Sequence, residues 1–280
     1  MPSSRPLKDT LPSEAALRTL QSQGRYLFLA AEFAQLTGRD DQVSATRLAL
    51  ARLARKGRVV SLVRRPSTWL IVPPEQQSYG APPVTWWLDD FLRGTEPGYY
   101  LALLSAARYW GSAHYARQAS QVMVARPRRR VRVGTLEIEF SRRNGVARTP
   151  VVVAADGVAA YRVSTREATL LDLVRHPKEV GGLEAILRIA RDLGPKMTSQ
   201  GIAQALDAQN QTAAAQRLGF VLSHVSTKLA APVARWLVGH RLRPQPLEPG
   251  VAQPGDALRY QPEWCIEFTL RQAAMLQEFA

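Results

Sequence analysis

The residues best suited to chemistry in this chain are cations that follow one another without a compensating acid. Residues 42–74 include seven Arg or Lys side chains and no Asp or Glu. Such a surface favours a phosphate backbone, because each cation that contacts a phosphate releases a condensed counterion, and no carboxylate nearby repels the strand. Double-stranded DNA is therefore the partner that we expect for this stretch.

Two helices and a hairpin are predicted to position these cations. A short helix over residues 29–36 ends at Gly38, and a longer one covers residues 42–56. The segments 58–63 and 68–72 are predicted to follow as a two-stranded hairpin. A helix, a turn, a second helix and a hairpin, in that order, are typical of a winged helix-turn-helix.

The faces of the longer helix follow from its helical spacing. The residues expected to face inward are Thr46, Ala49, Leu50 and Leu53, with Val43 and Ala54 beside them. The opposite face is small in the middle and cationic at its edges, which suits a major groove. The predicted DNA-contacting residues are Ser44, Arg47, Arg52, Arg55 and Arg58, with Arg64 and Arg65 at the hairpin tip. The alternative is a basic subdomain whose arginines are solvated, or one that binds protein.

Length and charge predict two domains. The chain has 280 residues, 46% of them hydrophobic, with a net charge of +14. We expect a DNA-binding domain at 1–75, a linker at about 73–83 rich in Pro, Gln and Gly, and a second domain at 84–280. The net charge is +6 in residues 1–75 and +8 in the much longer remainder, so nucleic acid is favoured over a membrane surface.

The expected location is the cytoplasm. No apolar run reaches the roughly 18 residues of a membrane-spanning helix, and the N-terminus lacks the pattern of a signal peptide. The single cysteine, Cys265, cannot form an internal disulfide and is consistent with a reducing compartment. It lies in a predicted strand, where a packed and inert thiol is expected.

The second domain is predicted to be α+β, with an antiparallel sheet and a separate helical layer. Two helices are expected at 84–94 and 98–111. Strands are expected at 120–125, 129–134 and 135–140, around a turn at Gly134 and Thr135, with another hairpin around Asp156 and Gly157. Ser164 and Glu167 form a capping-box pattern that opens the first of several helices. A last strand over 258–268 and a tail helix complete the prediction.

Two carboxylates raise the question of a metal site. Glu137 and Glu139 share one face of a predicted strand, a spacing that can hold a divalent cation. A metal-dependent nuclease or nucleotidyltransferase is therefore one alternative function for this protein. The stronger interpretation uses the neighbouring turn, which places Arg132 opposite Glu137 and Arg130 opposite Glu139 as ion pairs. The four histidines are scattered and form no pair at metal-ligand spacing. We therefore expect no metal, no cofactor and no enzymatic activity.

A second cluster of cations lies between two of these predicted strands. It consists of Arg126, Arg128, Arg129, Arg130 and Arg132. Two interpretations stay open at this point: a second phosphate-contacting surface, or partners for the two glutamates beside a solvated turn.

Three motifs, in order, resemble the AbiEi family of antitoxins from type IV, abortive-infection toxin–antitoxin systems. They are RLALARLARKGRVVSLVRR, then YYLALLSAARYWGSAH with QVMVARPRRRVRVGTLEIEF, then VSTREATLLDLVRHP followed by GGL. The resemblance implies an N-terminal domain that binds inverted repeats in its own promoter and represses its own operon. It also implies a C-terminal domain that counteracts a nucleotidyltransferase-like toxin, often without a stable complex, in defence against phage. The five-arginine cluster is then a candidate antitoxin surface.

The chain departs from the family pattern at the tip of the predicted wing. Family wings often carry a short basic-Gly-aromatic tip, whereas here residues 65–68 read Arg-Pro-Ser-Thr before Trp69. An alternative function is a ligand-responsive regulator, which requires a concave pocket with converging polar groups.

Overall fold

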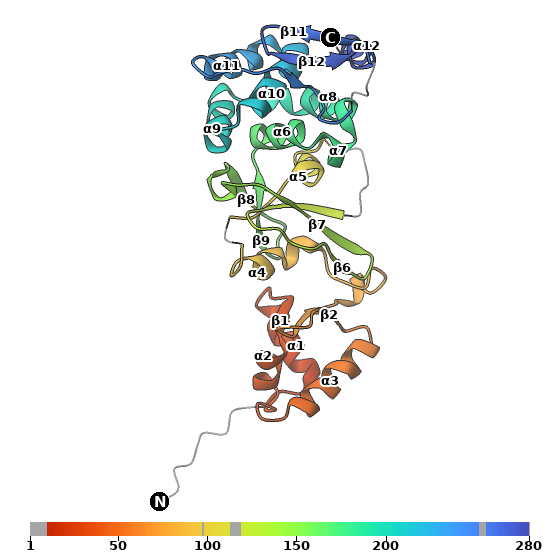
Figure 1. Ribbon diagram of the computed structural model, residues 1–280. Coiled ribbons are helices and arrows are strands. Elements are labelled where there is room, and N and C mark those ends of the chain that lie inside the picture. Colours follow the sequence, from red (N-terminus) through yellow and green to blue (C-terminus); the bar gives the residue numbers. More distant parts are fainter. Residues whose placement is uncertain (1–9, 97, 113–118, 252–255, 280) are drawn as a thin grey trace, which may run out of the picture.

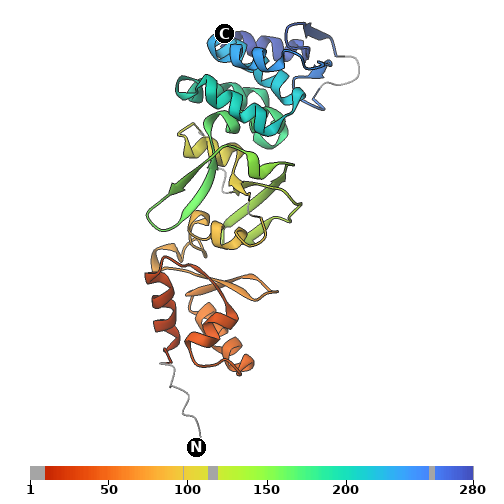
Figure 2. The same cartoon turned by 90° about the vertical axis from the view of Figure 1, so that its left-hand side faces the viewer.

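The computed structural model describes residues 10–96, 98–112, 119–251 and 256–279, and within them three units are stacked along one axis (Figure 1). A small α/β unit carries the N-terminus, a six-stranded sheet lies in the middle, and a layer of helices with a three-stranded sheet forms the far end. Figure 2, turned by 90°, shows the same stacking. The fold is mixed α+β.

In its described residues, the N-terminal unit contains three helices and three strands. The helices are α1 (Ser13–Ser22), α2 (Ala30–Leu36) and α3 (Val43–Arg55), and the strands are β1 (Leu27–Leu29), β2 (Val59–Val63) and β3 (Thr68–Ile71). Helices α2 and α3 and the β2–β3 hairpin are confirmed as predicted. The three-residue strand β1, too short for a detectable period, pairs antiparallel with β3 and completes a sheet of order β1-β3-β2.

Helical spacing identified most of the inward face of α3. Thr46, Leu50 and Leu53 are buried, and the two leucines pack with Phe28 and Phe33 in the core of this unit. Val43 is the exception, with 79% of its surface exposed. It opens the helix almost one turn before the first residue that reaches the core, so its predicted inward position is wrong.

The middle unit is a six-stranded mixed sheet of order β6-β7-β5-β4-β9-β8. Its strands are β4 (Tyr100–Leu101), β5 (Ala119–Val124), β6 (Val131–Val133), β7 (Leu136–Arg142), β8 (Val151–Ala155) and β9 (Ala160–Ser164). The prediction of an antiparallel sheet is wrong, because β7 pairs parallel with β5, and β9 pairs parallel with β4. The β6–β7 hairpin turns back so that its second strand, rather than its first, lies beside β5.

Three predicted elements are divided differently in the structure. The expected helix 98–111 splits into strand β4 and helix α5 (Leu103–Tyr109), and the helix 84–94 into a 3-10 turn η2 (Val84–Trp86) and α4 (Leu88–Leu92). The expected last strand is a hairpin of β11 (Leu258–Gln261) and β12 (Ile266–Thr269). A central strand is buried on both faces, so its apolar run has no period that distinguishes it from a buried helix.

The helical layer packs on the upper side of the sheet in Figure 1. Its helices are α6 (Arg166–Arg175), α7 (Pro177–Val180), α8 (Gly182–Leu193), α9 (Ser199–Gln209), α10 (Thr212–Val225), α11 (Thr227–Leu237) and α12 (Leu270–Phe279). Strand β10 (Gln245–Pro246) pairs with β12, and 3-10 turns occur at η1 (Pro74–Gln76), η3 (Val146–Arg148) and η4 (Gly194–Lys196).

The cap of α6 lies one residue later than predicted. Ser164 is the last residue of β9, and the Oγ1 of Thr165 accepts a hydrogen bond from the backbone N–H of Ala168 at 3.3 Å. Glu167 does not complete a capping box. Its buried carboxylate instead accepts the N–H of Thr198, at 2.9 Å, where α9 begins.

The segment 73–83 is not a free linker. Leu70 of β3 belongs to the same buried cluster as Ala81, Trp87 and Val122, so the sheet of the N-terminal unit and the middle unit share a core. Tyr79 O also accepts the backbone N–H of Thr135 at 2.9 Å. The N-terminal and middle units are therefore in direct contact across this segment. A chain cut at this segment would expose buried apolar surface, so the two units are best studied together.

Gly134 provides a test of this junction. Its φ is +56°, and a Cβ added there would lie 2.1 Å from Tyr79 O, whereas Gly157, in the β8–β9 turn with φ +87°, has nothing within 4 Å of such a Cβ. Both alanine variants carry backbone strain, but only Gly134→Ala also displaces the junction. We expect Gly134→Ala to lower the free energy of unfolding in urea by about 1–3 kcal/mol more than Gly157→Ala does. Equal losses of unfolding free energy in the two variants would show that the junction accommodates the added methyl group without losing stability.

Candidate nucleic-acid interface

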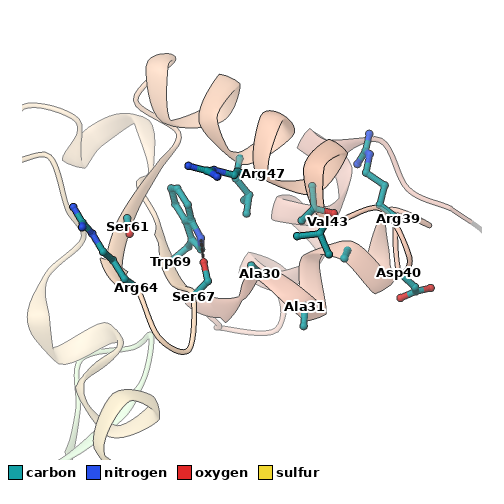
Figure 3. Close-up of a pocket in the computed structure, with 13 residues that line it drawn as sticks. Ala30, Ala31, Arg39, Asp40, Val43, Arg47, Ser61, Arg64, Ser67 and Trp69 are labelled. Atoms are coloured by element: carbon teal, nitrogen blue, oxygen red, sulfur yellow. Dashed lines mark hydrogen bonds between the residues drawn. The ribbon is translucent and has the colours of Figure 1, made fainter.

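A concave groove of about 800 Å³ lies between α2, α3 and the β2–β3 hairpin (Figure 3). Gly38, with φ +64°, allows the chain to reverse between the two helices, which brings the first half of α3 to face the hairpin. The groove is lined by Ala30, Ala31 and Ala34 from α2, Arg39 and Asp40 from the turn, Val43, Thr46, Arg47 and Leu50 from α3, and Ser61, Arg64, Ser67 and Trp69 from the hairpin.

The side chains at the hairpin end of the groove are oriented by the fold. Arg47 extends from α3 toward the Trp69 ring, and Arg64 projects from the hairpin on the other side of that ring (Figure 3). The indole Nε1 of Trp69 donates a hydrogen bond of 3.0 Å to Ser67 Oγ, which sets the ring orientation. The small side chains of α2 leave the space that makes this surface concave. Sequence reasoning missed Trp69 and Thr46 as groove residues, because their place in it depends on how α3 packs against the hairpin.

Most of the predicted DNA-contacting residues are exposed to solvent in the structure. Ser44, Arg47, Arg52 and Arg55 are exposed on α3, while Arg64 and Arg65 are exposed at the hairpin tip. Arg58 differs, since its Nε lies 3.4 Å from Glu14 Oε2 of α1 and its side chain is only 24% exposed. Because Glu14 largely compensates its charge, Arg58 is the weakest candidate for a DNA contact among the predicted residues.

The cluster of five arginines is divided by its own contacts. Arg128 donates to Thr95 Oγ1 at 2.8 Å, and its guanidinium lies over the rings of Phe91 and Phe140, at 5.1 and 5.5 Å. Arg126 and Arg129 are exposed, and neither forms an ion pair within the described ranges. Two of the five side chains therefore remain available to a partner.

The remaining two arginines of the cluster bind one glutamate. Arg132 is opposite Glu137 in the β6–β7 ladder, as predicted, with its Nε 3.1 Å from the carboxylate. Arg130 Nη1 also binds Glu137, at 3.2 Å, so its predicted pairing with Glu139 is wrong. The ladder of β6 begins only at Val131, which leaves the Arg130 side chain free to turn toward Glu137. Hydrogen bonds from Arg132 and then Arg130 lower the pKa of the Glu137 carboxyl.

A fully buried polar network joins the sheet to the helices, and nothing in the sequence identified it. Tyr100 OH donates to Asp172 Oδ2 and accepts from Arg143 Nη2, both at 2.9 Å. Gln209 Nε2 donates to Asp172 Oδ1 at 2.7 Å, and Arg143 Nε lies 3.6 Å from the same oxygen. Arg143 also binds Thr149. Burial raises the pKa of Asp172, against the opposing effect of the Arg143 guanidinium. The network is closed to solvent, so it supports the fold rather than a reaction.

The other candidate sites acquire local roles. His176 Nδ1 lies 2.9 Å from Glu179 Oε1, and no group of three or more His, Cys, Asp or Glu within the described part of the chain could hold a metal. His114 lies outside the described residues. Cys265 is in the β11–β12 turn with φ +48° and is partly buried, so its predicted place in a strand is wrong. No described helix is long and apolar enough to span a membrane.

The first of the comparisons with known proteins concerns the middle and far units. Residues 100–224, from β4 to the end of α10, match the family model described as the AbiEi antitoxin C-terminal domain. The crystal structure of the RV2827C protein from Mycobacterium tuberculosis is similar over 97% of this chain and 96% of that chain, with a TM-score of 0.65. At 17% sequence identity this likeness concerns the fold alone. A search of curated proteins found no match. Over residues 100–224 the chain therefore matches the C-terminal domain of AbiEi antitoxins, which supports the resemblance that the sequence motifs indicated.

Proposed function

We propose that this protein is an AbiEi-type antitoxin that binds operator DNA through a winged helix-turn-helix within residues 1–75 and thereby represses its own operon. The observation that carries the proposal is the exposed cationic surface that α3 and the β2–β3 hairpin form together. The order α1-β1-α2-α3-β2-β3 supports it, because this order places a helix and a hairpin tip beside one another for the two grooves of a duplex.

Each element has a distinct task in this proposal. Helix α3 enters the major groove, where Ser44 and Ala51 allow close approach and Arg47 reaches a guanine edge. Arg52 and Arg55 bind phosphates on the flanks, while Arg64 and Arg65 contact the adjacent minor groove or its phosphates. Two copies of the protein would occupy the two halves of an inverted repeat in the promoter. The experiment is a titration of the full chain with DNA from upstream of its own gene at several salt concentrations. A salt-independent interaction, or none, overturns the proposal.

The second half of the proposal concerns antitoxicity. The domain that contains residues 100–224 would counteract a nucleotidyltransferase-like toxin, and the available cations Arg126 and Arg129 are the candidate contact surface for an acidic partner. We propose no enzymatic reaction and no metal or cofactor for this domain, because two arginines already neutralise Glu137.

A matched pair of double variants tests the antitoxin surface. In cells that express the cognate toxin, Arg126→Gln with Arg129→Gln is expected to weaken protection while operator binding stays unchanged, because the pair lies outside α3 and the wing. The control is Arg259→Gln with Arg271→Gln, which removes the same charge from exposed positions at the far end of the molecule. Survival should fall only with the first pair. Equal protection by both variants would show that antitoxicity does not use this surface.

A further inference from the structure

The six-stranded sheet of the middle unit has one protected edge and one open edge. Strands β6 and β8 form these edges, on opposite sides of the unit (Figure 1). Proteins protect an edge strand with charged side chains or a covering segment, because its unpaired backbone groups can pair with another strand. Strand β6 contains Arg132 and follows Arg130, and the segment 73–83 covers its end, where Tyr79 O accepts the N–H of Thr135.

Strand β8 has neither kind of protection. Its five residues, Val151–Ala155, include no charged side chain, and β9 is the only strand that pairs with it among the described residues. The register with β9 is regular, and the central residue, Val153, is 73% exposed. Figure 2 shows the green β8–β9 hairpin projecting at the side of the middle unit. The β8 edge is therefore apolar, regular and accessible.

The backbone groups that face away from β9 follow from the register. Pro150 O accepts the N–H of Thr165 at 3.1 Å, which fixes the alternation of the ladder. In an antiparallel pair, every second residue directs both its N–H and its C=O to the partner strand, and the residues between direct theirs away. Pairing with β9 therefore uses the even-numbered residues of β8. The outward groups, which none of the described residues binds, belong to Val151, Val153 and Ala155.

These outward groups match those of a second copy of the same strand. If two β8 strands pair antiparallel about a two-fold axis at Val153, then Val153 lies opposite its own copy and Val151 lies opposite the partner's Ala155. Every residue in this register directs its backbone groups outward, so each pair can exchange both N–H···O=C bonds. The two exposed valine side chains at the axis then cover each other, which removes apolar surface from water.

The charges next to the edge do not oppose this pairing. Arg162 lies opposite Val153 on β9, so it is one strand further from the axis than β8 itself. Asp156 follows β8 and would lie opposite the partner's Pro150 rather than its own copy, and its Oδ2 already accepts the Thr85 hydroxyl at 2.6 Å. Like charges therefore do not meet across the axis.

We propose that the β8 edge is an interface between two copies of this chain, which joins their six-stranded sheets across a two-fold axis. The pairing occupies the edge of each copy, so association stops at the dimer. A short strand pair buries less than the roughly 1,200 Å² of a standard interface, so we expect a Kd of about 10–100 µM. The halves of an inverted repeat are also related by a two-fold axis, and this use of the dimer rests on the proposed DNA-binding function. The contact itself does not.

Sedimentation velocity of the full chain, from about 5 to about 500 µM, tests the interface around the expected Kd. Val153→Lys places two like charges opposite each other at the axis, and Val153→Pro removes an outward N–H that β9 does not use. Each should weaken association by about tenfold or more. The matched control is Val238→Lys, the same substitution at a valine that is 79% exposed after α11, and it should associate as the natural protein does. Both lysine variants should melt within about 2 °C of the natural protein.

Mixing two variants distinguishes a second copy from a foreign strand. Residue 153 faces itself only across a two-fold axis, so Val153→Lys and Val153→Glu should each associate weakly alone and recover association when mixed. A mixture that stays monomeric overturns the two-fold register. A natural protein that stays monomeric over the whole range, including one that binds an extended peptide instead, overturns the interface, as does association that survives both Val153→Lys and Val153→Pro.

Binding to DNA with a single half-site separates this interface from the proposed function. Val153→Lys should bind such DNA as the natural protein does, because β8 lies outside α3 and the β2–β3 hairpin. A monomeric protein that binds the half-site overturns the interface and leaves the DNA-binding function standing. Association through β8 without any DNA binding supports the interface and overturns the proposed function.

Discussion

Asp172→Ala is expected to lower the free energy of unfolding of the full chain by about 3–5 kcal/mol. The substitution leaves the buried Arg143 guanidinium without its carboxylate, and it removes the acceptor of hydrogen bonds from Tyr100 and Gln209. Breaking a buried pair from one side is costly because the remaining charge is neither solvated nor compensated. Unfolding in guanidinium chloride, followed by circular dichroism, measures the loss.

Two further variants show whether the loss comes from burial. Glu184→Ala removes the carboxylate of an exposed pair with Arg188, whose side chains are 49% and 54% exposed, and should change stability by no more than about 0.5 kcal/mol. The double variant Arg143→Met with Asp172→Leu removes both charges and should recover much of what Asp172→Ala loses. If Asp172→Ala costs no more than Glu184→Ala, the network does not hold the sheet to the helices.

Arg47→Ala is expected to weaken binding to the operator by about 1–3 kcal/mol, and to weaken binding to random sequence less. Arg47 lies in the first half of α3, where recognition helices contact base edges, so its loss should relax specificity at one base pair. For the natural protein, about four phosphate contacts predict a slope of log K against log salt of roughly −3 to −4. Arg64→Ala should reduce the magnitude of that slope by about one contact.

Fluorescence anisotropy with operator and scrambled duplexes at four salt concentrations measures both effects. Arg259→Ala is the control, since it removes one exposed charge at the far end of the chain and should change neither affinity nor slope. An Arg47→Ala variant that loses equal affinity for both duplexes would make Arg47 a phosphate contact instead of a base reader. A variant with full affinity would remove α3 from the proposed interface.

Several parts of the site were predictable because they depend on nearby residues. Periodicity placed α3 and identified Thr46, Leu50 and Leu53 as its inward face, which burial confirms. The turn at Gly134 and Thr135 predicted that Arg132 lies opposite Glu137, and the β6–β7 register confirms it. Within a helix or a tight hairpin, the spacing of the side chains follows from backbone geometry alone.

Other features depend on packing between distant segments, which periodicity does not report. The central strand β4 has the same apolar composition as the helix that was predicted there, because burial on both sides removes any pattern. Arg143 belongs to a run of polar and basic residues that resembles a solvated turn, yet it is 1% exposed. Only the approach of α6 and α9 to the end of β7 provides the carboxylate and amide that make its burial possible.

The sequence by itself determined the cationic α3 and hairpin, the α+β class and the resemblance of residues 100–224 to the AbiEi antitoxin C-terminal domain, since local spacing and motifs specify them. The tertiary structure decided the mixed order of the sheet, the shared core at residues 73–83 and the groove around Trp69. It also showed that Glu137 binds both Arg130 and Arg132, and that Arg58 is held by Glu14. These features join residues far apart in the chain, and their free energy comes from burial that exists only once the units have packed together.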